Sequence, residues 1–147
     1  MEYIEDIKEA NLGTRTSCIS QGTNNAPLFK KMFISFGTMI TRFRRGCKPF
    51  IGIDGCFLKG SYKGVLLIAM ALDANNGYFP LAYEIVEMEN KDNWASFLRT
   101  LRIYLDGMDL STHTFISERH NVCQNDSFYV VIYVKYICFV FCQFPLN

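Results

Sequence analysis

The chain has 147 residues, of which 50% are hydrophobic and 20% charged, so its composition is that of one globular domain and not of a disordered segment. Its formal net charge of +1 excludes a uniformly basic nucleic-acid coat protein and an acidic solvating tail. The charges are unevenly spread: residues 10–53 carry seven bases and no acid, and residues 54–118 carry nine acids and five bases. Two differently solvated surfaces would give this distribution, and so would the phosphate-binding and cation-binding parts of a metal-dependent nucleic-acid enzyme.

The first third of the chain predicts two helices joined by a loop. Residues 1–12 have a weak apolar face at helical spacing and end before Gly13. Residues 13–27 are polar and rich in turn formers, which indicates a loop. The apolar residues from Leu28 to Phe43 recur at helix-like spacing, so an amphipathic helix is expected there despite Gly37.

Three strands are expected next. Phe50–Leu58 is a strand candidate with an acid in its middle, and Val65–Leu72 is a continuous apolar run typical of a strand covered on both faces. Asn75–Gly77 contains the residues that tolerate a positive φ in a tight turn. Phe79–Val86 is then the returning strand of a hairpin.

A helix and a further strand follow. Asn90 or Asp92 can cap a helix that runs to about Leu105, and Thr114–Ser117 is a short strand. The apolar residues that share one face of this helix are Trp94, Phe97, Leu98, Leu101 and Leu105. The order strand-strand-strand-helix-strand predicts an α/β or α+β domain.

The six cysteines are expected to be reduced. Met1–Ala10 is acidic and lacks the apolar core of a signal peptide, so no secretory route to disulfides is expected. The spacings His120-x2-Cys123 and Cys138-x3-Cys142 loosely resemble those of zinc ligands. A zinc site is therefore an alternative to buried free thiols.

The C-terminal residues differ in character from the rest of the chain. Residues 128–144 form an aromatic, β-branched run without a clear period, divided by Lys135. A membrane span needs about 20 mostly apolar residues, so this run is short for one and a membrane partner is not expected. A tail anchor, a sheet-forming segment and a misplaced segment are the alternatives.

Two acids are the main candidates for chemistry. Asp54 stands in the middle of a predicted strand, where an apolar side chain is usual, and a carboxylate there would need a cation, a base or an exposed sheet edge. A strand end or turn with Asp-Gly at the surface is the alternative. Glu118 directly follows the last predicted strand. If that strand lies parallel beside the first, the two carboxylates approach each other at neighbouring strand ends and suit a divalent-metal site.

Other acids have simpler structural interpretations, and Glu84 remains a further candidate. Asp73 is expected to be a turn acid, and Glu87, Glu89 and Asp92 to favour the N-terminal dipole of the following helix. The chain contains no glycine-rich phosphate loop, and neither histidine stands in a nucleophile–base motif.

A series of motifs in order resembles the Mutator-like element (MULE) transposases of plants. The segments that carry the resemblance are Ala10–Thr14 (ANLGT), Pro49–Gly64 (PFIGIDGCFLKGSYKG), Leu72–Gly77 (LDANNG), Phe79–Asn90 (FPLAYEIVEMEN), Asn93–Leu98 (NWASFL) and Ile116–Arg119 (ISER). Together they cover roughly residues 1–120, and several motifs in order are more specific than any one alone.

The resemblance implies a ribonuclease H-like α/β fold and a DDE/D set of acids that uses Mg²⁺ or Mn²⁺ to cleave and join DNA strands. By position Asp54 would be the first metal-binding catalytic acid. Glu118 stands where the family has an Asp in a Ser-Asp-Arg stretch, and it carries the carboxylate one methylene further out. The family's third acid and its Cys/His motif have no recognisable counterpart in His120–Asn147, so the chain is expected to be a truncated, inactive transposase domain.

The resemblance also implies DNA as the partner and the nucleus as the location. The candidate DNA-binding residues are Arg42, Arg44, Arg45, Lys48, Lys59 and Lys63. The expected organisation is a helical, basic lead-in over 1–48, a partial transposase domain over 49–120 and an aberrant aromatic tail over 121–147. A host-adopted DNA-binding protein without catalysis and a nonfunctional fragment are the alternative functions.

Overall fold

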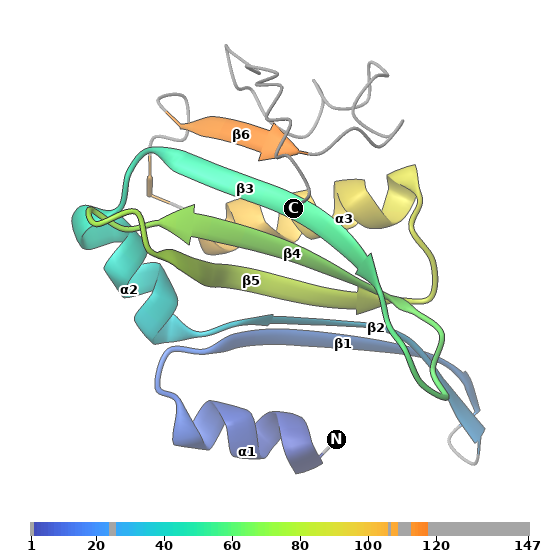
Figure 1. The fold of residues 1–147 in the computed structure, drawn as a ribbon. Coiled ribbons are helices and arrows are strands. Elements are labelled where there is room, and N and C mark those ends of the chain that lie inside the picture. The colour runs from blue at the N-terminus through green and yellow to red at the C-terminus, as the bar shows by residue number, and fades with distance from the viewer. Residues whose placement is uncertain (1, 24–25, 106, 109–112, 118–147) are drawn as a thin grey trace.

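The computed structural model describes residues 2–23, 26–105, 107–108 and 113–117. Within these residues the chain forms three helices and a mixed six-stranded sheet (Figure 1). The elements in chain order are α1 (Glu2–Ala10), β1 (Arg15–Thr23), β2 (Ala26–Ser35), α2 (Gly37–Gly46), β3 (Phe50–Phe57), β4 (Val65–Leu72), β5 (Tyr78–Val86), α3 (Lys91–Tyr104) and β6 (Thr114–Ser117). The strands lie in the order β1-β2-β5-β4-β3-β6.

The three predicted central strands form an antiparallel meander, as the sequence indicates. β3 pairs with β4 and β4 with β5, both antiparallel. The turn between β4 and β5 places Asn76 at a φ of 65°, the left-handed conformation that Asn tolerates. Asp73 stabilises this turn, because its Oδ1 accepts the backbone N–H groups of Asn75 and Gly77 at 2.8 and 2.7 Å.

Helix α3 carries the chain from β5 across the back of the sheet to β6 (Figure 1). Asn90 caps it, since its Oδ1 accepts the backbone N–H of Asn93 at 2.8 Å. β6 lies parallel beside β3, with Phe50 opposite Thr114 and Ile53 opposite Ser117. The predicted order strand-strand-strand-helix-strand is confirmed.

The prediction for the N-terminal third is wrong in two places. Residues 15–23, expected in a loop, form β1, and the first part of the helix expected over Leu28–Phe43 is β2; only its second part is helical, in α2. β2 pairs with β1 along its length and with β5 over Lys31–Ile34. These partners decide the conformation, because pairing with distant strands overrides a weak local helical spacing.

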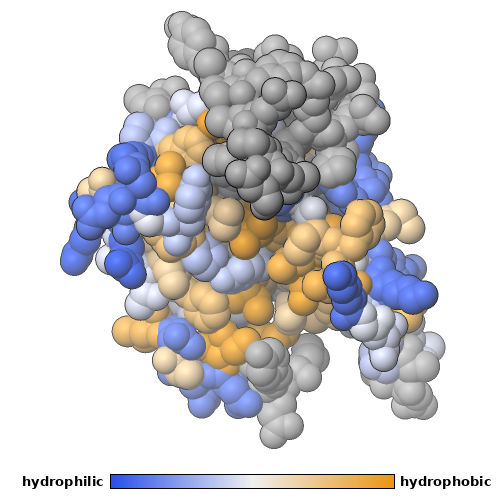
Figure 2. Space-filling view, viewed as in Figure 1, coloured by the Kyte–Doolittle hydropathy of each residue, from blue (hydrophilic) through white to orange (hydrophobic). Residues whose placement is uncertain are grey.

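The core lies between α3 and one face of the sheet. Its buried residues include Phe33, Ile51, Ile53, Leu67, Ala69, Ala82, Val86, Trp94, Phe97, Leu98 and Leu101. In β4 the side chains on this face are buried, and those on the opposite face are only half-buried. The expectation that β4 is covered on both faces therefore holds for one face alone. We call the other one, which faces the viewer in Figure 1, the open face; Figure 2 shows apolar residues across its middle and hydrophilic ones at its margins.

The start of α2 lies against the backbone that joins α1 to β1. A Cβ at Gly37 would lie 2.5 Å from the carbonyl oxygen of Leu12 and 2.6 Å from the carbonyl carbon of Gly13. Both atoms belong to backbone, which cannot move aside as a flexible side chain can. Glycine at this position therefore lets the N-terminal segment meet α2.

We expect Gly37→Ala to lower the free energy of unfolding by roughly 1–3 kcal/mol, the usual cost of overpacking. Gly46→Ala, at the other end of the same helix, is the matched control, because no atom lies within 4 Å of a Cβ built there. That control is expected to be neutral or stabilising by about 0.5 kcal/mol. Urea unfolding of the two variants measures the difference, and equal midpoints would contradict the close approach at Gly37.

Candidate functional site

Asp54 lies in the middle of β3 and its side chain is exposed on the open face. It stands opposite Ile68 of β4, and the preceding Ile53 is buried against the α3 side of the sheet. Its strand is an inner one, between β4 and β6. The carboxylate is therefore not buried, and it reaches the surface from the middle of an inner strand and not from a sheet edge, a strand end or a turn. Strand alternation directs it from the centre of the sheet to solvent.

Among the described residues, the carboxylate of Asp54 has one hydrogen bond, to its own neighbour. Its Oδ1 accepts the backbone N–H of Gly55 at 2.7 Å. An exposed carboxylate of this kind suits a hard cation such as Mg²⁺ or Mn²⁺ as one ligand, but a protein site needs further oxygens. In the described ranges no cluster of three or more His, Cys, Asp or Glu side chains could hold a metal ion.

Directly behind Asp54, α3 packs against the backbone of β3. A Cβ at Gly55 would lie 3.3 Å from Oε1 of Glu89 and 3.4 Å from the ring of Trp94. The Trp94 Nε1 donates a hydrogen bond of 3.0 Å to that same carboxylate oxygen. This contact was not predicted from the sequence, although a glycine inside a strand is a signal of close approach by another group. The contact holds the strand in place where it presents Asp54.

The second candidate acid, Glu118, lies outside the described residues. The residue before it, Ser117, is opposite Ile53, which is the residue before Asp54. The crossover and the parallel pairing that the sequence analysis required are thus confirmed. The approach of the two carboxylates stays a prediction.

The other acids on this part of the chain have structural partners. Asp73 stabilises the β4–β5 turn, as expected. Glu87 forms an ion pair with Lys30 at 3.0 Å. Glu89 accepts a hydrogen bond from Trp94, so it has a structural contact in addition to the expected interaction with the helix dipole. None of these three carboxylates is a partner of Asp54 in any contact described here.

Glu84 is on the opposite face of the sheet from Asp54. It stands opposite Leu67 and Phe33, both buried on the α3 side, and is itself only 1% exposed. The Lys31 ammonium lies 3.9 Å from Oε1 of Glu84 and also contacts Ser96 of α3. Oε2 of Glu84 has no hydrogen-bond partner within the part of the chain that the structure describes. Burial raises the pKa of Glu84 to about 6, and the Lys31 charge offsets only part of that effect.

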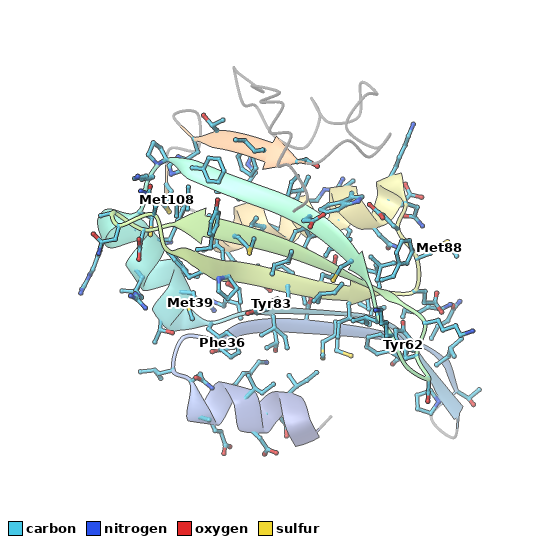
Figure 3. All side chains as sticks on the ribbon, in the orientation of Figure 1. Phe36, Met39, Tyr62, Tyr83, Met88 and Met108 are labelled. Carbon is cyan, nitrogen blue, oxygen red and sulfur yellow. The ribbon has the colours of Figure 1, made fainter. Side chains whose placement is uncertain are left out.

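The predicted DNA-binding residues form two groups. The α2 basic group, which consists of Arg42, Arg44, Arg45 and Lys48, precedes β3. The loop basic group, Lys59 and Lys63, follows β3 in the loop to β4. β3 has eight residues, so about 25 Å of strand separates the two groups. Figure 3 shows this separation, with Met39 of α2 and Tyr62 of the loop at opposite ends of the sheet.

Part of the α2 basic group also has a structural role. The Arg42 guanidinium lies 5.9 Å from the centre of the Phe79 ring, and the Lys48 ammonium contacts the side chain of Asn76 in the β4–β5 turn. Arg44 and Arg45 are in the last turn of α2, where positive charge favours the helix dipole.

The family model of the MULE transposase domain matches residues 50–141, which is more than half of the chain. The chain belongs to the MULE transposase domain family. The matched range runs beyond residue 120, where the resemblance found in the sequence ends, and includes most of the aromatic tail. No curated protein and no solved structure matches this transposase domain. In its described part no helix is long and apolar enough to span a bilayer.

The buried Glu84 gives this transposase domain a pH-dependent stability. Its pKa is about 6 in the folded chain and 4.5 at its ordinary value, so between these values the folded state binds the proton more tightly. Stability is therefore lost as the pH rises from about 4.5 to 6, by about 2 kcal/mol for a shift of this size.

We expect Glu84→Gln to be about 2 kcal/mol more stable than the parent chain at pH 7, with the difference vanishing below pH 4.5. Glu87→Gln is the matched control, because Glu87 is a more exposed acid of the same strand end with its own lysine partner. It is expected to change stability by less than about 1 kcal/mol at either pH. Urea unfolding at the two pH values tests this, and a Glu84→Gln variant that is less stable at pH 7 would refute it.

Proposed function

We propose that this MULE domain takes part in metal-dependent cleavage and joining of DNA strands, with Asp54 and Glu118 as metal-binding acids. The observation that carries the proposal is the parallel pairing of β6 with β3, in which Ile53 and Ser117 stand opposite each other. Each of these residues directly precedes one of the two acids. Because adjacent residues of parallel strands run in step, this register supports a shared site.

The sheet supports a ribonuclease H-like fold for the same domain. β5, β4 and β3 form an antiparallel meander, α3 crosses over one face, and β6 returns parallel to β3. This is the order that the family resemblance implies. The hairpin of β1 and β2 extends the sheet beyond β5.

The open face gives Asp54 the surroundings that such a reaction needs. A divalent metal ion would supply Lewis acidity at the phosphate and at the attacking water. Asp54 would hold it by a carboxylate oxygen that solvent and a DNA backbone can reach, and the two basic groups would bind phosphates on either side of it. We propose the nucleus as the location, because the substrate is DNA.

Glu118 is the acid that fits the proposed metal site less well. A glutamate carries its carboxylate one methylene further from the backbone than the aspartate that the resemblance implies at this position. Catalytic geometry tolerates displacements of less than about 1 Å before the rate falls steeply. We infer that the chain with Glu118 binds metal weakly and does not cleave DNA by itself.

We expect Asp54→Asn to lower the affinity of the chain for Mn²⁺ by at least about tenfold, because the variant loses a charged oxygen ligand. Glu118→Asp is expected to raise both the affinity and the nicking of supercoiled plasmid, and adding Asp54→Asn to it should abolish the gain. Electron paramagnetic resonance titration of free Mn²⁺ measures binding independently of activity.

Asp73→Asn is the matched control for this test, since Asp73 is an acid at the end of β4 whose Oδ1 is occupied by backbone N–H groups. It should leave the affinity for Mn²⁺ unchanged. If Asp54→Asn behaves like Asp73→Asn, Asp54 is not a metal ligand.

A second candidate function is DNA binding without catalysis, as in a host-adopted regulatory protein. The α2 basic group favours it, because it gathers four cations within seven residues of a segment that contains no acid. Such binding needs neither Asp54 nor a metal ion.

We expect the affinity for duplex DNA to fall as the salt concentration rises. When Arg42, Arg44 and Arg45 are all replaced by Gln, the slope of log affinity against log salt concentration should become less steep by roughly 2.7, at about 0.9 per phosphate contact. Gln variants of Arg99 and Arg102, which are exposed bases of α3, are the control and should change the slope little. Fluorescence anisotropy at several salt concentrations measures the slope. A slope that does not change in the triple variant would exclude α2 as a DNA contact.

A further inference from the structure

The loop between β3 and β4 exposes two aromatic rings beside two lysines. Phe57, the last residue of β3, is 75% exposed, and Tyr62 is 40% exposed. Lys59 and Lys63 lie between and beside them and are exposed as well. This loop is the second half of Pro49–Gly64, the longest of the segments that resemble the MULE family. The two aromatic rings have no role in the proposed metal site.

The loop is held in a defined conformation. The backbone N–H of Leu58 donates to the carbonyl of Gly64 at 2.9 Å, which closes the loop at its base. Gly64 is required there, because a Cβ would lie 2.4 Å from the ring of Tyr62 and 2.5 Å from the carbonyl oxygen of Val86. The ring of Tyr62 thus lies directly over the loop backbone.

A second contact fixes the same ring from the side. The ring of Phe29 in β2 meets that of Tyr62 edge to face, with centroids 5.3 Å apart and planes at 83°. The pKa of Tyr62 is raised by burial and then by the nearby Glu87 carboxylate, so the hydroxyl stays protonated. Tyr62 therefore presents a preoriented, neutral ring that is partly exposed to solvent.

The charges of the loop itself have one sign. No Asp or Glu occurs between Gly55 and Leu72, so Lys59 and Lys63 are the only charged residues of the loop and of β4, while β3 carries Asp54 three residues before Phe57. Glu87, whose carboxylate raises the pKa of Tyr62, is already paired with Lys30. The surface is hence apolar and cationic together, a combination that suits a ligand with flat apolar faces and negative charges.

We propose that this loop binds unpaired nucleotides of the DNA substrate, with bases stacked on Phe57 and Tyr62 and phosphates bound by Lys59 and Lys63. The inference rests on the proposed function, which makes DNA the substrate. Phe57 is three residues beyond Asp54, about 10 Å along the strand, and alternation directs it to the opposite face of the sheet. The bound nucleotides are accordingly expected past the end of β3, about 10 Å or more from Asp54 and not beside it on the open face.

The test compares two DNA probes on the full chain by fluorescence anisotropy at one salt concentration: a short labelled oligothymidylate and a blunt labelled duplex. Phe57→Ala should weaken binding of the oligothymidylate roughly 5- to 100-fold, as the loss of one stacked base does, and leave the duplex unaffected. Phe57→Leu should weaken it nearly as much, because leucine keeps the apolar volume without the ring, and Phe57→Trp should retain binding. Tyr78→Ala, which removes a 66% exposed ring at the other end of the sheet, is the control and should change nothing.

The lysines are tested separately. Replacing Lys59 and Lys63 by Gln should lower the salt slope of oligothymidylate binding by about 1.4, at about 0.7 per contact on single strands. If Phe57→Ala binds as the parent does while the lysine variant weakens, only phosphates are bound and the stacking proposal is wrong. If Phe57→Leu binds the oligothymidylate as well as the parent does, apolar volume without a ring is enough for binding and the stacking proposal is also wrong.

These outcomes are separable from failure of the proposed function. If Phe57→Ala binds the oligothymidylate as the parent does, while the chain still binds duplex DNA and still needs Asp54 to bind Mn²⁺, this inference alone is overturned. If neither probe binds, the DNA substrate itself is excluded and both proposals fall.

Discussion

The burial of one face of α3 against β3, β4 and β5 is the interaction on which the rest of this structure depends. Phe97, Leu98 and Leu101 of that helix are at most 2% exposed, and each contributes about 1.5–3 kcal/mol by leaving water. Because the helix must lie across the sheet to bury these residues, the chain emerges at the far side of β3 and adds β6 parallel to it. The same packing brings Trp94 against Gly55, so the strand that presents Asp54 is held from behind.

This packing also divides the ionisable groups of the MULE domain between two environments. On the α3 side Glu84 is buried, its pKa is raised, and Lys31 is its closest charge. On the open face Asp54 is exposed, and its Oδ1 accepts the backbone N–H of the neighbouring Gly55. The buried acid therefore acts on stability, while the exposed one is available to a ligand. A single residue's shift in register would exchange these roles, since neighbouring strand residues point to opposite faces.

The N-terminal hairpin is joined to this unit by strand pairing, by the buried Phe33 and by specific polar contacts. β2 meets β5 over Lys31–Ile34, and the Ser35 hydroxyl donates to the carbonyl of Leu81 at 2.7 Å. Further out, the Lys30–Glu87 ion pair and the contact between Phe29 and Tyr62 connect the hairpin to β5 and to the β3–β4 loop. The hairpin thus supports the loop that we propose as a nucleotide site, and the two are expected to act as one surface.

By itself the sequence determined the order of elements from β3 to β6, the turn at Asn75–Gly77 and a helix cap at Asn90 or Asp92, because those depend on neighbours within a few residues; the structure has Asn90 as the cap. It also determined the family, through motifs that run in order along the chain. Only the tertiary structure decided that residues 15–35 are strands, since their partners are distant in sequence, and that Asp54 is exposed although its strand is internal. The separation of the two basic groups by the length of β3, and the close approach of Trp94 to Gly55, were likewise decided by packing, which no local pattern records.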